Sequence, residues 1–203
     1  MTNKALFLKW IKNLFYIQCV VFVVNIVGQF PIFDFVFKWI STLFIIAKVY
    51  CFYQLKPVHE RYSKAFTFAA IYAGGTIVAN VIDLGLLSLV ISICSLIALY
   101  QEFAGHAELL LTIDNKLSKR WRALFNWEVF GSIIVAIVGT PLIMIAAITT
   151  MFDEGVMAML TTIIVVGYSL IIQAIYIYFL KCTHDVCEKH ESWIDEVVHG
   201  DEI

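Results

Sequence analysis

Six long apolar runs constrain this chain more than any other feature of its sequence. They cover residues 14–30, 35–53, 65–82, 84–100, 127–149 and 156–180. Each is near the roughly 20 residues that a helix needs to cross a hydrocarbon core of about 30 Å. Hydrophobic residues make up 61% of the chain and charged residues 15%, against about 45–50% and about 25% in a soluble domain. Residues 132–138 lack the alternation of barrel strands. The sequence therefore predicts an all-α, polytopic integral membrane protein of about six transmembrane helices, with the bilayer as its main partner.

The breaks between the runs are of two kinds. Residues 29–34, 82–85 and 152–155 form short acidic breaks that contain Gly, Pro or Asp, and these residues favour tight turns. Residues 54–64 and 101–122 form longer, basic breaks. The pattern predicts three consecutive transmembrane hairpins within one domain, residues 1–180, followed by an acidic tail, residues 181–203.

The distribution of positive charge predicts the orientation. Of the 14 Lys and Arg residues, 12 lie in the N-terminal segment, the two basic loops and the tail, and none lies in the acidic turns. Cytoplasmic loops carry such an excess of Lys and Arg. We therefore expect both termini in the cytoplasm. The first run lacks a signal-peptide cleavage site, and the external turns are short, as suits a bacterial cytoplasmic membrane.

Four polar residues at membrane depth allow two interpretations. Lys38 and Lys48 lie within the second span, where Lys48 could extend to the cytoplasmic surface and Lys38 could pair with Asp34. Alternatively, one of these lysines faces a polar cavity between helices. Asn25 and Gln173 are expected to hydrogen-bond across helices, and together with the two lysines they form the candidate polar path.

Small residues are expected to mediate helix packing. Lipid already solvates apolar side chains, so helices associate in a membrane where small residues permit close approach. Pro141 is expected to kink the fifth span because proline cannot donate a backbone hydrogen bond. The predicted packing residues occupy the third and fifth spans: Ala65, Ala69, Ala73, Gly74, Gly75, Ser132, Ala136 and Thr140. Such faces also favour a homo-oligomer.

Motifs for catalysis or cofactor binding are absent from the sequence, and we expect no enzyme activity. Glu102 and His106 lie one helical turn apart, and a surface pair is favoured over an acid–base pair. The tail contains four residues of metal-ligand type, but their spacing matches no zinc motif, and no metal or cofactor is expected: Cys182, His184, Cys187 and His190.

Two cytoplasmic segments have apolar residues at helical spacing. Helix four is expected to continue into the cytoplasm and to turn near Asn115, and the tail is expected to form a short amphipathic stripe. An exposed apolar stripe requires a partner to cover it. The predicted docking residues for a cytoplasmic protein are Phe103, Leu110, Leu117, Trp121, Trp193, Ile194 and Val197.

Two functions fit these features. The first is a non-enzymatic membrane subunit that oligomerises and recruits or signals to a cytoplasmic partner, for example as a sensor, scaffold or gating component in a defence or signalling system. The second is a small transporter or channel subunit with a substrate path between the helices. Neither function involves direct contact with nucleic acid.

Overall fold

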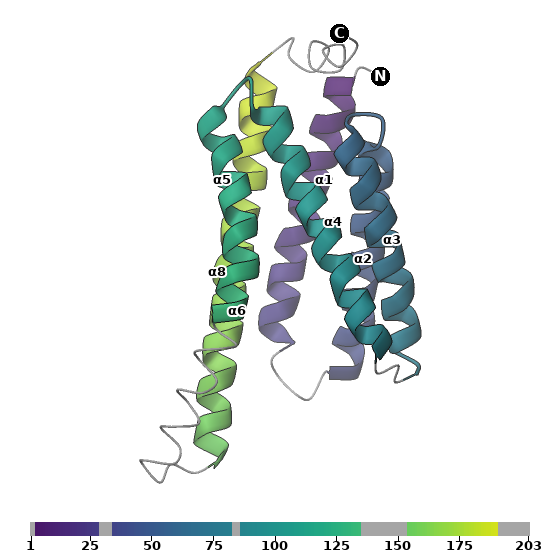
Figure 1. Cartoon of the computed structure of the whole chain (residues 1–203), viewed down its shortest axis with the longest axis vertical. Coiled ribbons are helices and arrows are strands. Elements are labelled where there is room, and N and C mark those ends of the chain that lie inside the picture. Colours follow the sequence, from purple (N-terminus) through teal and green to yellow (C-terminus); the bar gives the residue numbers. More distant parts are fainter. Residues whose placement is uncertain (1–2, 29–33, 83–85, 135–153, 191–203) are drawn as a thin grey trace.

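The computed structural model describes residues 3–28, 34–82, 86–134 and 154–190, and every regular element in these ranges is helical. Helices α1 (Asn3–Val27), α2 (Asp34–Leu55), α3 (Glu60–Ala79) and α4 (Leu86–Leu110) run alternately up and down (Figure 1). A short helix α5 (Asn115–Asn126) continues through a π-helical turn η2 (Trp127–Gly131) into α6 (Ser132–Ile134). The long helix α8 (Glu154–Lys189) packs against α1. The all-α prediction is confirmed for this part of the chain.

Three helical segments of the described part are long and apolar enough to cross a membrane, namely Asn3–Val27, Ser88–Leu110 and Ile163–Lys189. This number is smaller than the predicted six. A shorter apolar segment, Trp39–Leu55, lies in α2. Helix α3 is rich in weakly apolar Ala, Gly, Thr and Tyr, and most of the predicted fifth span lies outside the described residues, as do Ala136, Thr140 and Pro141.

Large apolar side chains are exposed on several helices. Val23 on α1 is 56% exposed, Leu43 on α2 is 65% exposed and Leu89 on α4 is 58% exposed. Soluble monomers rarely expose large contiguous apolar patches. Lipid tails would solvate such side chains without a hydrophobic penalty, which agrees with the three helical segments that are apolar enough to cross a membrane.

Two connections and two helix ends lie together at one end of the bundle. The first turn of α1, the α2–α3 and α4–α5 turns and the last turn of α8 all lie at the same end (Figure 1). Lys4 on α1 donates from Nζ to the backbone carbonyl of His190, 2.6 Å away, and so ties the two helix ends together. The two basic loops and the described parts of the N-terminal segment and the tail therefore lie on one side of the molecule.

The predicted end of the fourth helix is confirmed. Helix α4 ends at Leu110, and Asp114 starts α5 by accepting a hydrogen bond from the backbone N–H of Leu117 at 2.9 Å. Asp is a favoured N-cap residue because its carboxylate satisfies a free N–H in the first helical turn. The turn folds α5 back along α4, and it thereby places the apolar stripe of α5 against the same chain.

Ala65, Ala69 and Ala73 form the buried face of α3, with 0%, 5% and 6% exposure, so the packing prediction is confirmed for them. Gly75 lies against Ile91 of α4, whose Cγ1 would be 2.6 Å from a Cβ atom at that position. Gly74 has open space around it, and Ser132 is exposed and hydrogen-bonds the backbone of its own helix, so the packing prediction is wrong for these two within the described chain. The buried alanines therefore pack inside the described part of the chain, and Gly75 allows close approach of α3 to α4.

We expect Gly75→Val to destabilise the protein by about 1–3 kcal/mol, because added methyl groups overpack a close helix contact. Gly74→Val is the matched control, since it makes the same change in helix propensity one residue away in open space. Thermal unfolding in detergent, followed by circular dichroism, measures both. Equal losses of stability for the two variants would contradict the close contact at Gly75.

Candidate functional site in the bundle interior

A buried ion pair joins three helices. The Lys48 Nζ atom of α2 lies 2.8 Å from Oε2 of Glu102 on α4, and the Glu102 side chain is 0% exposed. The Tyr176 hydroxyl of α8 donates to the other carboxylate oxygen, Oε1. Lys48 also lies over the Tyr176 ring, 5.2 Å from its centroid. Removing two charges from water is costly unless they are paired, and ionisable residues inside a membrane bundle are usually functional.

This ion pair overturns two predictions. Lys48 does not extend to the cytoplasmic surface but faces Glu102, and Glu102 and His106 are not a surface pair, since both are 0% exposed. The sequence shows how far a lysine lies from the end of its own helix, but it does not show which side chain of another helix lies opposite. The side chain of Lys38 lies outside the described part of the structure.

A cavity of about 270 Å³ lies next to the ion pair, between α1, α2 and α3. Lys48 is 23% exposed, and it lines the cavity together with Asn25 and Ser41. Gln18 and Tyr72 contribute an amide and a hydroxyl group. The remaining wall is apolar: Ile17, Val21, Val24, Phe44 and Ile45. The described residues of this lining thus include one cation and several hydrogen-bonding groups, but no carboxylate.

Asn25 and Gln173 meet across the bundle. Nδ2 of Asn25 on α1 donates to Oε1 of Gln173 on α8 at 3.1 Å, which confirms the predicted interhelical hydrogen bond. Three of the four residues of the candidate polar path therefore lie inside the bundle: Asn25 and Lys48 line the cavity, and Gln173 holds Asn25. The bond connects the wall of the cavity to α8, the helix that also carries Tyr176.

A second cluster of buried polar side chains lies around Trp121. The indole Nε1 of Trp121 donates to Oγ1 of Thr183 at 2.9 Å, and its ring lies 4.6 Å from the His106 ring. Nδ1 of His106 is 2.7 Å from the hydroxyl of Tyr62, and burial raises the pKa of Tyr62, which remains a neutral phenol. Nε2 of His106 is buried and has no hydrogen-bond partner among the described residues.

The docking stripe predicted on α4 and α5 is internal. Its four residues are at most 4% exposed, so within this chain they cannot form a surface for a cytoplasmic partner, and that prediction is wrong for Phe103, Leu110, Leu117 and Trp121. The segment is amphipathic as the pattern predicts, but α4 and α8 cover the apolar face of α5. The other three docking residues lie outside the described ranges: Trp193, Ile194 and Val197.

Arg61 forms a clamp between α3 and α4 at the end of the bundle where the α2–α3 turn lies. Arg61 of α3 donates from Nε and Nη2 to the Glu108 carboxylate of α4 at 2.8–3.1 Å, and from Nη1 to Gln101 at 3.1 Å. The hydrogen bonds to the Glu108 carboxylate raise the pKa of Arg61. Bidentate Arg–carboxylate pairs combine charge with fixed geometry. The clamp therefore fixes α3 against α4 above the buried ion pair.

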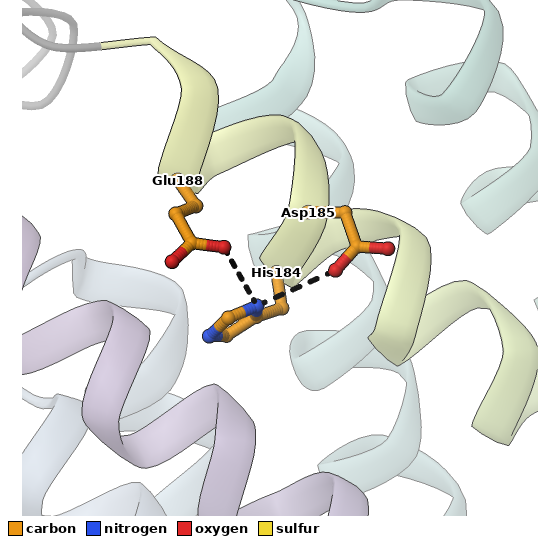
Figure 2. Close-up of side chains that lie close together, drawn as sticks. All are labelled: His184, Asp185 and Glu188. Carbon is orange, nitrogen blue, oxygen red and sulfur yellow. Dashed lines mark ion pairs between the residues drawn. The ribbon is translucent and has the colours of Figure 1, made fainter.

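The tail residues of metal-ligand type do not converge as a set. His184 Nδ1 lies 3.6 Å from Asp185 and 3.9 Å from Glu188, as Figure 2 shows, so the imidazole faces two carboxylates of its own helix. Cys187 is fully buried, whereas Asp185 and Glu188 are exposed. An exposed His–carboxylate group on one helix is common without a metal ion.

Comparisons with protein-family models, curated proteins and solved structures found no significant match to the chain. The residues themselves must therefore identify the site. Sequence reasoning missed Glu102 as the partner of Lys48 and missed Tyr176 entirely. The sequence did contain a hint of this pair, because Lys48 lies near the end of the second predicted span and Glu102 lies two residues after the end of the fourth.

Proposed function

We propose that this protein is a small membrane transport protein that binds a compact anionic solute in the cavity beside Lys48. The main support for the proposal is the cavity, because the partly buried ammonium group of Lys48 and several hydrogen-bonding groups line it within an otherwise apolar bundle. The solute class follows from the lining. A carboxylate would accept hydrogen bonds from the ammonium hydrogens of Lys48 that do not point at Glu102 and from the hydroxyls of Ser41 and Tyr72, while a cation would find no carboxylate among the described lining residues.

The depth of the cavity supports transport. Its lining residues Val21, Phe44 and Tyr72 lie near the midpoints of the predicted spans 14–30, 35–53 and 65–82. Transporter sites commonly lie near the bilayer midplane, where polar side chains are costly and are retained for function. With this function we propose a six-span topology in the cytoplasmic membrane, with both termini on the cytoplasmic side.

The size of the cavity limits the solute. At about 30 Å³ for each water molecule, a volume of 270 Å³ holds roughly nine waters. It lies slightly below the usual range for sites of drug-sized ligands, about 300–1,000 Å³. A solute of a few carbon atoms with one carboxylate fits this space, whereas a nucleotide or a lipid does not.

This function has more support than the oligomeric recruiting subunit. The docking stripe on α4 and α5 is buried, and the small residues of α3 pack within the chain. These were two of the surfaces through which assembly and recruitment were expected, and both pack within the described part of the chain. The polar residues of separate helices, in contrast, converge on one cavity, an arrangement that no single helix reveals.

Uptake into proteoliposomes tests the proposal. Pyruvate and glycerol have the same number of heavy atoms, and we expect protein-dependent uptake of pyruvate but little of glycerol. Ser41→Ala and Tyr72→Phe each remove one hydroxyl from the cavity and are expected to reduce pyruvate uptake about fivefold to tenfold, the effect of about 1 kcal/mol per hydrogen bond.

Two matched controls separate the cavity from general damage. Ser92→Ala and Tyr50→Phe make the same chemical changes at exposed positions and should leave uptake unchanged. Pyruvate flux equal to that of protein-free liposomes would contradict transport of small carboxylates. Equal loss of uptake in the control variants would contradict the assignment to this cavity.

A further inference from the structure

We infer that α1 and α8 form a binding site for the headgroup of an anionic phospholipid, separate from the solute cavity. Lys12 of α1 and Lys181 of α8 line one cavity of about 260 Å³. Phe15, Tyr16 and His184 complete its lining. Two ammonium groups from helices far apart in the sequence thus converge on a space that contains no carboxylate among its described lining residues.

The two lysines lie at the same depth. Lys4 contacts His190, and each helix rises about 1.5 Å per residue. From this contact, Lys12 is eight residues along α1 and Lys181 is nine residues back along α8, so the antiparallel helices bring them level. Lys12 directly precedes the first predicted span and Lys181 directly follows the sixth, which places the cavity at the membrane–water boundary.

The lysines are available for a ligand. Neither forms an ion pair with another of the described residues. Two acids that follow Lys181 on α8, Asp185 and Glu188, lie 3.6 and 3.9 Å from Nδ1 of His184 (Figure 2). A phosphate group would accept hydrogen bonds from both ammonium groups.

The surface of α1 between Lys12 and Val23 favours a lipid over free phosphate as the ligand. The same face of α1 continues toward the membrane interior with exposed Tyr16, Val20 and Val23, which are 54%, 45% and 56% exposed. Their spacing of four and three residues follows the helical repeat. A cationic pocket above an exposed apolar strip matches the headgroup and acyl chain of a phospholipid, and the aromatic side chain lies at the headgroup level.

Native mass spectrometry of the full-length protein with phosphatidylglycerol and phosphatidylcholine tests this site. We expect the wild-type protein to retain phosphatidylglycerol preferentially. The double variant Lys12→Gln/Lys181→Gln should reduce this preference about thirtyfold, the combined contribution of two lysines near an anionic lipid. Glutamine removes the charge but keeps a polar side chain that is only slightly shorter than lysine, and the circular dichroism spectrum verifies folding.

The control variant Lys116→Gln/Lys119→Gln removes the same charge from two exposed lysines of α5 and should leave the lipid preference unchanged. Equal loss in both double variants would show a general charge effect and overturn the site. Displacement of the bound lipid by millimolar inorganic phosphate would overturn the lipid as its ligand. Equal retention of the two lipids by the wild-type protein would overturn the proposal altogether.

Discussion

Glu102→Leu is expected to reduce the free energy of unfolding by about 3 kcal/mol, because it leaves the Lys48 ammonium without its partner inside the bundle. Removal of one member of a buried ion pair typically costs about 3–5 kcal/mol. The lower end applies here, since Lys48 is 23% exposed and the cavity supplies some polar groups. The variant also removes the acceptor of the Tyr176 hydroxyl.

A double variant separates the charge from the shape of the site. Lys48→Met/Glu102→Leu removes both charges, and apolar replacement of a complete buried pair is often neutral or stabilising. We therefore expect it to recover most of the stability that Glu102→Leu loses, while pyruvate uptake is abolished. Glu60→Leu is the surface control, since its pair with Lys64 is exposed and contributes little.

Urea unfolding in detergent micelles gives the three free energies. If the double variant were less stable than Glu102→Leu alone, the unpaired charge would not be the cause of the loss. If the double variant recovered its stability and still transported pyruvate normally, the ion pair would have a structural role only. Lys48 would then not belong to the proposed solute site.

Trp121→Ala is expected to cost about 3–5 kcal/mol, the usual effect of removing a buried aromatic side chain. Trp121 is 0% exposed, its ring contacts His106 and Phe103, and its indole N–H is bonded to Thr183. The substitution therefore leaves a cavity between α4, α5 and α8 and an unpaired hydroxyl. We expect α5 to detach from the bundle first, which protease sensitivity near residue 114 would report.

Trp127→Ala is the matched control, because this tryptophan lies six residues further along the chain and is 64% exposed. Its loss should cost well under about 1 kcal/mol, as for most surface substitutions. Similar costs for the two tryptophans would contradict the burial of Trp121. Retention of stability in Trp121→Ala with loss of a cytoplasmic partner would restore the docking function that the sequence suggested.

The helical character of the chain could be predicted because it depends on local properties. Long apolar runs require backbone hydrogen bonds within the segment, and the run lengths match a bilayer. The turn near Asn115 was also predictable from the apolar periodicity of the segment, and the structure places it between Leu110, the last residue of α4, and Asn115, the first residue of α5. The buried face of α3 followed from the four-residue spacing of Ala65, Ala69 and Ala73.

The direction in which the side chains of α4 and α5 point was decided by tertiary packing. Periodicity identifies an apolar face but not the surface that covers it. The sequence therefore supported a docking surface at Trp121, whereas α8 of the same chain covers that residue. The same limitation applies to Gly74 and Gly75, because only the position of Ile91 distinguishes them.

Sequence alone indicated a helical chain suited to lipid, with its basic residues in the loops and tail, because hydropathy and charge are summed along the chain. The meeting of Lys48, Glu102 and Tyr176 depends instead on the relative positions of α2, α4 and α8. Those positions result from interhelical packing between residues more than fifty positions apart. The ion pair, the cavity beside it and the convergence of Lys12 with Lys181 therefore became visible only in the tertiary structure.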